Sequence, residues 1–491
     1  MAKARLAALA LAASLLASCG GSGAPRPPHG GAVLRLALPL VPGTLDPAHA
    51  ADLPSLNVAH ELYAGLTRFS ATGVEPDLAA SWDVDQGGLV WTFHLRNDIR
   101  WSDQRPITAA DFRRSWVRAL APRTAAPYAG PALGIVRGAR RFHATGRGGL
   151  GVEAVDDRTL RVTLQHPVPW FDQLAAFPIA APAPPRPTAF SGPFRLASRT
   201  GERLVLERNP AYWNAAAVKP RRLFLTASAK GADVVLPTGL AGPGLPWVDT
   251  SRPAPSRASE LPLLATGLLW FVTRGTPLAD PAARLYVAWV VTHLDLGADP
   301  ARLVPPELPG ASTVNSHAPV LLRSRPGPLR LTLVWARTDA EGSRIVAALR
   351  RSTKRLRAYD IELDYRPARN LGELLGLAGP PARPAVDLVV LGWSSKIFDA
   401  YNLLDLFPCG SAFNVAQWCD RSYDALMRQA VRTLDDRARW RIERRLVEKL
   451  HDAVPAIPVY TASDHVSLAP GVHGFSWSPI GFYELLGMTR S

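Results

Sequence analysis

The sequence predicts an α/β protein that is built from more than one lobe. Segments with the two-residue alternation of strands are interleaved with segments that have helical spacing, an order typical of α/β folds. Residues 387–392 predict a strand whose residues are apolar after Asp387, as expected for a parallel strand that is buried on both faces. The chain has 491 residues, and the 473 that follow residue 18 (491 − 18) are enough for two or three lobes with their own cores.

In the N-terminal half, strand and helix patterns follow one another closely. Helical spacing predicts a helix over 57–69. Thr108, with Asp111 three residues later, has the pattern of a capping box, so a second helix is expected to begin there. The proline-dense stretch 178–187 predicts a surface connection. Alternating apolar residues predict strands over 33–38, 89–95, 160–164, 192–196 and 203–207.

The C-terminal half has the pattern of a second α/β lobe. Residues 282–293 are strongly apolar and predict a buried crossover helix. A strand–helix–strand unit is expected over 329–335, 342–356 and 361–365. Residues 423–452 form a long amphipathic helical region. No internal repeat is found along the chain.

The N-terminal residues have the order of an export signal. Lys3 and Arg5 precede the apolar run 6–16, and small residues then lead to Cys19. This order also fits a lipobox, in which Cys19 is acylated; an ordinary signal peptide with an accidental cysteine is the alternative. Residues 1–18 are then a signal peptide, and the Gly-, Pro- and Ser-rich residues 19–32 are a lipidated tether. We expect attachment to the cell membrane on its extracytoplasmic side.

Cys409 and Cys419 are the only other cysteines in the sequence. In an exported chain, two cysteines this close predict a disulfide. Such a bond would stabilise the fold by about 3 kcal/mol in the chain-entropy model. Two free buried thiols are the alternative, and a metal is not expected, because no histidine stands at ligand spacing from the pair.

Charge and motifs exclude several classes of function. The net charge is +15, but the arginines are scattered without a basic stripe that contains aromatic residues, so no nucleic-acid partner is expected. The signatures H-E-x-x-H, G-x-S-x-G, C-x-x-C, S-x-x-K and the P-loop lysine are all absent. We therefore expect no enzyme activity, no metal and no cofactor. A secreted enzyme is kept as an alternative.

Several sequence blocks carry a resemblance to a known family. The stretch "WTFHLRNDIRWSDQRPITAADFRRSW" at 91–116 is the most specific, and the others follow in the expected order. They include "TLDPA" at 44–48, "ELYAGLTRF" at 61–69, "SGPFRLAS" at 191–198 and "PAIPVY" at 455–460. Together they resemble the dipeptide- and oligopeptide-binding lipoproteins of ABC importers, which are bacterial extracellular solute-binding proteins of family 5. The resemblance covers about residues 33 to 487.

This resemblance implies a type II periplasmic-binding-protein fold with an extra subdomain. Two α/β lobes would close on a ligand by a hinge. Lobe I would be discontinuous, the subdomain would be inserted in it, and lobe II would follow in one piece. The expected ranges are 33–64, 170–269 and 461–491 for lobe I, 65–169 for the subdomain and 270–460 for lobe II.

The resemblance also implies a ligand site between the lobes. On lobe I it places Ala51, Asp52, Leu53 and Tyr128 at the cleft. On lobe II it places Trp393, Ser394, Ser395 and Lys396 there. In peptide-binding relatives, an aspartate stands three residues after the tryptophan and pairs with the α-ammonium of the peptide. Lys396 occupies that position in this sequence.

A lysine at this position changes the expected ligand. It would repel an ammonium group inside a closed cleft, so we expect N-blocked peptides or anionic solutes. Asp52 could take over the ammonium or could pair with Lys396; for both residues, solvated surface charge is the alternative.

The resulting hypothesis is a receptor that captures a peptide or similar polar solute for an ABC permease. We expect this receptor to be a lipid-anchored monomer. A receptor or sensor for a non-peptide or anionic ligand, with no transport role, is the alternative.

Overall fold

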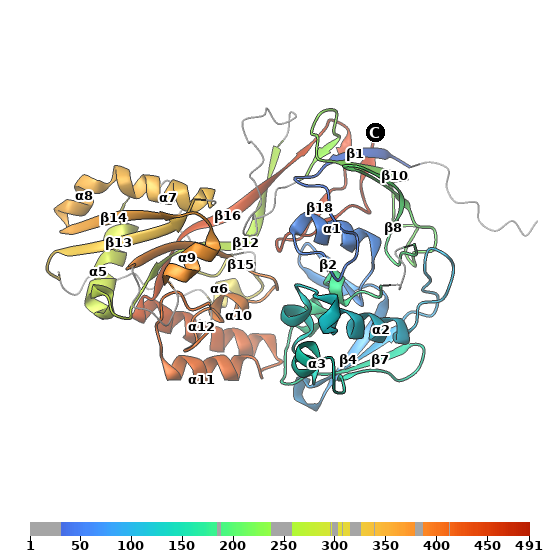
Figure 1. Ribbon diagram of the computed structural model, residues 1–491, viewed down its shortest axis with the longest axis horizontal. Coiled ribbons are helices and arrows are strands. Elements are labelled where there is room, and N and C mark those ends of the chain that lie inside the picture. The colour runs from blue at the N-terminus through green and yellow to red at the C-terminus, as the bar shows by residue number, and fades with distance from the viewer. Residues whose placement is uncertain are drawn as a thin grey trace, which may run out of the picture. The chain divides into compact units, whose positions relative to one another are not determined.

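The computed structural model (Figure 1) describes residues 31–183, 188–236, 258–294, 296, 303–306, 308–314, 326–337, 339–378, 386–411 and 413–491. The predicted signal peptide, Cys19 and residues 20–30 lie outside the described residues. The described residues contain a ten-stranded sheet with the order β14-β13-β15-β12-β16-β11-β1-β10-β9-β8. In chain order these strands are β1 (Val33–Ala37), β8 (Phe194–Thr200), β9 (Arg203–Arg208), β10 (Arg222–Thr226), β11 (Val234–Val235), β12 (Ala258–Phe271), β13 (Leu329–Ala336), β14 (Ile361–Ala368), β15 (Leu388–Ser394) and β16 (Ala456–Leu468).

Two long strands, β12 and β16, belong to both lobes. One end of β12 pairs with β15, from Ala265–Ser394 to Phe271–Leu388. Strand β16 pairs with β12 on its other side along nearly its whole length, from Ala258–Ser467 to Trp270–Ala456, and β16 in turn pairs with β11 in the N-terminal part of the sheet. These strands carry the chain from one lobe to the other and back, so the two-lobed α/β architecture predicted from the sequence is confirmed. The residue ranges expected for the lobes and the subdomain stay predictions.

A separate four-stranded sheet has the order β4-β5-β7-β6. Its strands are β4 (Ala79–Asp85), β5 (Val90–Leu95), β6 (Val152–Ala154) and β7 (Thr159–Thr163). Helix α2 (Ala109–Leu120) contacts β6 and β7 and contributes the fully buried rings of Phe112 and Trp116. The expected capping interaction is present, because Asp111 Oδ2 accepts a hydrogen bond from Thr108 N at 2.8 Å.

The lobe that contains β13, β14 and β15 also contains several helices. They include α5 (Pro281–Thr292), α7 (Ala340–Arg351), α8 (Thr353–Ala358), α9 (Leu371–Ala378), α11 (Arg421–Ala430) and α12 (Asp436–Ala453). Of these helices, α7, α8 and α9 contact the three strands. The helix expected over 342–356 is interrupted at Ser352, and the helical region 423–452 is two helices. Asp435 causes the second break, because its carboxylate accepts a hydrogen bond from Ala438 N at 2.7 Å and so begins a new helix.

Two other expectations were wrong. The helix predicted over 57–69 begins and ends earlier, as α1 (Leu53–Leu62), and strand β2 (Thr67–Ser70) follows it. The surface connection predicted over 178–187 begins with residues 178–182, which are buried. Prolines mark chain breaks, but they also pack well in a core when no backbone N–H is needed. In the described part of the chain, no helix combines the length and apolar character that a membrane crossing requires.

Candidate functional site

The predicted ligand residues of lobe II lie at the carboxyl edge of a parallel sheet. Strand β13 pairs in parallel with β14 on one side and with β15 on the other. After β13 the chain continues to β14 on one side, whereas after β15 its next strand is β16, which lies in the opposite direction along the sheet. Open α/β sheets bind ligands beside the carboxyl ends of strands at such a switch point. Trp393 and Ser394 end β15, and Ser395 and Lys396 follow it, so all four stand at this edge.

Tyr460 of β16 explains the glycine that precedes Trp393. Its ring lies across β12 and β15, where a Cβ atom on Gly267 would come within 1.9 Å of Tyr460 Cε1. A Cβ atom on Gly392 would lie 2.9 Å from the Tyr460 hydroxyl oxygen. Both positions therefore require glycine for the ring to stay in place, and the ring fixes the backbone from which the loop 393–396 leaves.

Asn402 holds the loop 393–396. Its Oδ1 accepts hydrogen bonds from Lys396 N at 3.0 Å and from Trp393 Nε1 at 3.3 Å. Ser395 is fully buried, and its hydroxyl donates to Ile397 O at 2.6 Å. Ser395 therefore shapes the loop, whereas Trp393 and Ser394 are half-buried and Lys396 is exposed.

Lys396 is exposed as a residue, but protein atoms surround its ammonium group. Its side chain contacts water, yet burial lowers the pKa of its ammonium group. Protein atoms around an ammonium group lower its pKa because they remove water that would solvate the charge. Among the described residues, no carboxylate oxygen lies within 4.0 Å of its Nζ.

The predicted residues of lobe I gather around the start of α1. Asp52 is not a free loop charge, because its carboxylate caps the helix and accepts hydrogen bonds from Ser55 N and Ser55 Oγ, both at 2.8 Å. Ala51 is exposed, and Leu53 and Tyr128 are half-buried. Burial, followed by the negative charge of Asp52, raises the pKa of Tyr128, so these two residues lie in one neighbourhood. The structure does not bring Asp52 and Lys396 together as an ion pair within the described part of the chain.

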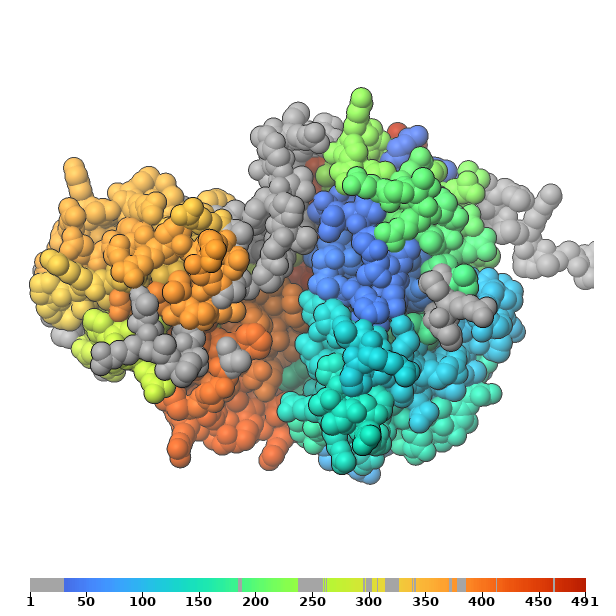
Figure 2. All heavy atoms as spheres, in the orientation of Figure 1, coloured from blue at the N-terminus to red at the C-terminus, as the bar shows by residue number. Residues whose placement is uncertain are grey.

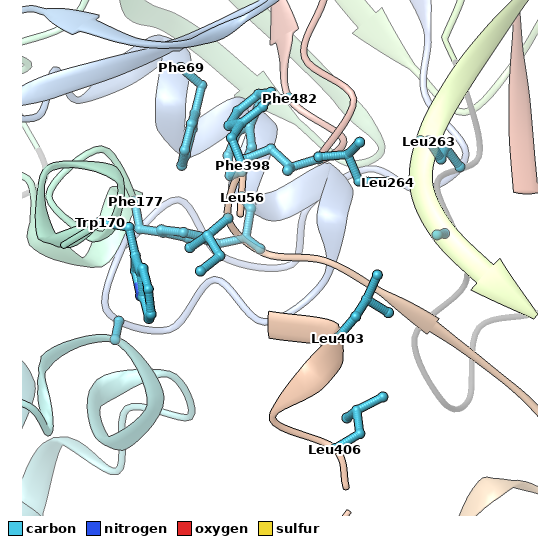
Figure 3. Packing of buried hydrophobic residues seen from close by; sticks show 14 of the residues in the cluster. Leu56, Phe69, Trp170, Phe177, Leu263, Leu264, Phe398, Leu403, Leu406 and Phe482 are labelled. Atoms are coloured by element: carbon cyan, nitrogen blue, oxygen red, sulfur yellow. The ribbon is translucent and has the colours of Figure 1, made fainter. Parts of the chain in front are cut away.

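Contacts between segments far apart in the sequence hold the loop after Lys396 against lobe I. Phe398 N donates a hydrogen bond to Gln173 Oε1 at 2.6 Å. Phe398 belongs to the same cluster of buried apolar residues as Leu56 and Phe482, and Figure 3 draws all three. The ring centroids of Trp170 and Tyr401 are 4.5 Å apart.

A buried charge cluster supports the same loop. Asp399 accepts two hydrogen bonds from Arg439, at 2.9 and 2.7 Å, and both residues are almost inaccessible. Burial and the adjacent Asp399 carboxylate raise the pKa of Glu443, which is fully buried, to about 10. Nothing in the local sequence indicates these contacts, because Asp399 and Arg439 are 40 residues apart. In the described chain, no group of three histidines, cysteines or carboxylates is placed to hold a metal ion.

Comparisons with known proteins agree with this geometry. Residues 73–284 match the family model of bacterial extracellular solute-binding proteins, family 5, middle part. The probable deoxycholate-binding periplasmic protein YgiS of Escherichia coli (strain K12) is 28% identical over 494 residues, which cover 88% of this chain and 89% of the relative. The periplasmic oligopeptide-binding protein OppA of the same strain is 27% identical over 488 residues, with 88% of each chain covered.

A solved structure shows the same fold. The unliganded open form of the periplasmic murein tripeptide-binding protein MppA superposes with a TM-score of 0.78 at 22% identity, covering 93% of this chain and 97% of that chain. The family match, the full-length relatives and the two-lobed fold agree with each other. Together they support an assignment of the chain to the bacterial extracellular solute-binding proteins of family 5, with a substrate-binding role.

Proposed function

We propose that this chain is the lipid-anchored receptor of an ABC importer and captures its ligand between the two lobes, outside the cytoplasm. It acts as a monomer that delivers the ligand to ABC permease subunits. The names of its relatives support this role: OppA is a periplasmic oligopeptide-binding protein, and YgiS is a probable deoxycholate-binding periplasmic protein. A free peptide and deoxycholate differ greatly in shape, but each carries a carboxylate.

The observation that carries the proposal is the environment of Lys396. Lys396 is an exposed residue just after β15, burial lowers the pKa of its ammonium group, and no carboxylate oxygen lies within 4.0 Å of its Nζ among the described residues. Such a cation is available to an anionic ligand group. We infer that Lys396 binds a carboxylate or another oxyanion, and that the preferred ligand has no free α-ammonium at this subsite, as in an N-blocked peptide or an anionic solute.

The lobe I residues supply the opposite side of the proposed site. Asp52 already accepts two hydrogen bonds from Ser55, but a carboxylate has about four lone-pair positions and can accept more. Ala51 and Leu53 flank it, and Tyr128 offers a hydroxyl group and a ring. We propose that this cluster contacts the part of the ligand that is distant from Lys396.

The exchange Lys396→Asp tests the charge preference directly. We expect it to weaken binding of an N-acetylated tetrapeptide by about ten- to hundredfold, because a charge-assisted hydrogen bond contributes about 1.5–3 kcal/mol. Binding of the same tetrapeptide with a free amino terminus should improve. Isothermal titration calorimetry on both proteins measures both changes.

Lys354→Asp is the matched control, because this exposed lysine belongs to α8 in the same lobe. It should leave both affinities unchanged. If the wild type and Lys396→Asp bind both peptides with equal affinity, Lys396 is only a surface charge and does not bind the ligand. Deoxycholate in the same titrations tests the second candidate, a receptor for a non-peptide anion, which the name of YgiS favours.

A further inference from the structure

One face of the sheet formed by β1, β10, β9 and β8 is basic and open to solvent. Along β1, β9 and β10, buried residues such as Leu34, Leu204 and Leu223 alternate with exposed or half-buried ones, whereas most of β8 is exposed or half-buried. The outer set contains four arginines and a single carboxylate. They are Arg35, Arg195, Arg203, Arg222 and Glu207. The green atoms near the top of Figure 2, from residues 188–236, show that this segment reaches the surface.

Two of these arginines, Arg203 and Arg222, line a hollow whose lining residues include no carboxylate. The hollow has a volume of about 520 Å³ and is lined by Ala197, Ser198, Thr200, Arg203, Val205, Arg222 and Phe224. Glu207 is already paired with Arg195 at 2.7 Å and with Arg222 at 3.4 Å. The Arg203 guanidinium lies 4.8 Å from the centroid of the Phe224 ring. Within the described residues, no carboxylate oxygen lies within 4.0 Å of the guanidinium of Arg35 or Arg203.

The N-terminal segment joins this same sheet beside the hollow. Val33, the first residue of β1, pairs in parallel register with Arg222. Cys19 precedes Val33 by 14 residues (33 − 19), which can span at most about 50 Å when fully extended. A lipid on Cys19 would therefore keep the edge of this sheet within that distance of the membrane surface.

We propose that this basic sheet face docks on the anionic lipid headgroups of the membrane that holds the N-terminus. Guanidinium groups bind phosphate oxygens in pairs, and basic residues are drawn to the negative potential of an anionic membrane within a Debye length of its surface. The lipid brings the face near the membrane, and the arginines fix which face is turned toward it. The inference rests on the lipid anchor of the proposed function and adds an orientation that the anchor alone does not give.

The experiment uses the lipidated protein in vesicles. Ser198→Cys introduces a free thiol in the hollow for a fluorescent label, since Cys19 is acylated and Cys409 and Cys419 are bonded to each other. Headgroup-labelled quencher lipids then report whether the hollow touches the membrane. We expect strong quenching in vesicles of equal parts phosphatidylglycerol and phosphatidylcholine, and weak quenching in pure phosphatidylcholine or at high salt.

Charge variants decide whether the arginines cause the contact. Arg203→Glu/Arg222→Glu should reduce the excess quenching by about tenfold. The neutral pair Arg203→Gln/Arg222→Gln should give an intermediate loss, and it serves if the reversed pair folds poorly. Arg330→Glu/Arg344→Glu is the matched control, because it makes the same change in net charge at two exposed arginines of β13 and α7.

Three outcomes would overturn the docking surface: equal quenching in both kinds of vesicle, no effect of the Arg203 and Arg222 exchanges, or an equal loss in the control pair. Flotation of the unlabelled protein with neutral vesicles tests the anchor separately. Protein that floats but is not quenched contradicts the docking surface alone, whereas protein that does not float contradicts the anchor. Ligand affinity, measured by calorimetry, should be unchanged in all charge variants.

Discussion

At the scale of single residues, Gly267 and Gly392 show how closely the sheet beside the loop 393–396 is packed. The Tyr460 ring occupies the space that a side chain at Gly267 would need. Gly267→Ala should therefore lower the free energy of unfolding by about 1–3 kcal/mol, the usual cost of overpacking a core. Chemical denaturation measures this loss, and ligand affinity should fall with it if Tyr460 positions the loop after β15.

Gly376 provides a control in which the same exchange has the opposite sign. It lies exposed in α9, and a Cβ atom added to it would meet no heavy atom within 4 Å. Gly376→Ala should raise the free energy of unfolding by about 0.5–1 kcal/mol, because alanine loses less backbone entropy in a helix. A loss of stability in this variant as well would show that the proximity of Tyr460 is not what distinguishes the two sites.

Glu61 belongs to a buried group of charges near the C-terminus. Arg68 contacts Glu61 at 3.3 Å and Glu484 at 2.9 Å. Glu61 Oε1 also accepts a hydrogen bond from Leu485 N at 3.2 Å. Burial raises the pKa of Glu61 to about 7, although the Arg68 charge acts in the opposite direction. The folded protein therefore holds this proton more tightly than the unfolded chain does.

Stability should consequently depend on pH through Glu61. A carboxyl with a raised pKa in the folded state contributes most below its unfolded value of 4.5, and this contribution is lost as pH rises to about 7. His60 acts oppositely, because burial lowers its pKa to about 4. Subtracting the free energy of unfolding of Glu61→Gln from that of the wild type removes the contribution of His60, which both proteins share. The difference in free energy of unfolding, wild type minus variant, should fall between pH 4.5 and 7. A constant difference would contradict the raised pKa.

At the scale of elements, the segment between α10 (Tyr401–Leu404) and α11 is closed by Cys409 and Cys419. Asn414 stabilises this segment, because its Nδ2 donates hydrogen bonds to Phe407 O at 2.9 Å and to Trp418 O at 2.7 Å. A non-reduced digest of the exported protein should yield the two cysteine peptides linked, as mass spectrometry would show. Cys409→Ser/Cys419→Ser should lower the free energy of unfolding by about 3 kcal/mol. Free thiols at both positions in the wild type would contradict the bond.

The same scale shows what sequence patterns can predict. Strands such as β13 and the apolar helix α5 were predicted to within a few residues, because burial imposes a strict period on them. The breaks at Ser352 and Asp435 were missed, since an amphipathic pattern continues across a cap. Lys396 was identified through the resemblance. The residues that hold the loop around it, Gln173, Tyr460 and Arg439, were not predicted, because their contacts depend on tertiary packing between distant segments.

At the scale of the whole molecule, β12 and β16 connect the two lobes. These strands run through both lobes, and the contacts of Trp170 with Tyr401 and of Gln173 with Phe398 join further distant segments. The loop 393–396 is therefore fastened on one side while Lys396 stays exposed. If one ligand binds both Lys396 and the Asp52 cluster, as proposed, it favours the arrangement of the lobes in which both groups contact it.

The proposed place of the molecule in the cell rests on Cys19, which follows the signal-peptide pattern directly. Two or three acyl chains on one cysteine hold a protein on a membrane firmly, whereas one chain binds only marginally. Cys19→Ser should therefore move the protein from the membrane fraction to the soluble fraction, or leave it unprocessed. Its affinity for ligand should be unchanged, because no proposed ligand residue lies before Ala51. Fractionation and intact mass measure both. A Cys19→Ser protein that is processed and still as firmly membrane-bound as the wild type would contradict the lipid anchor.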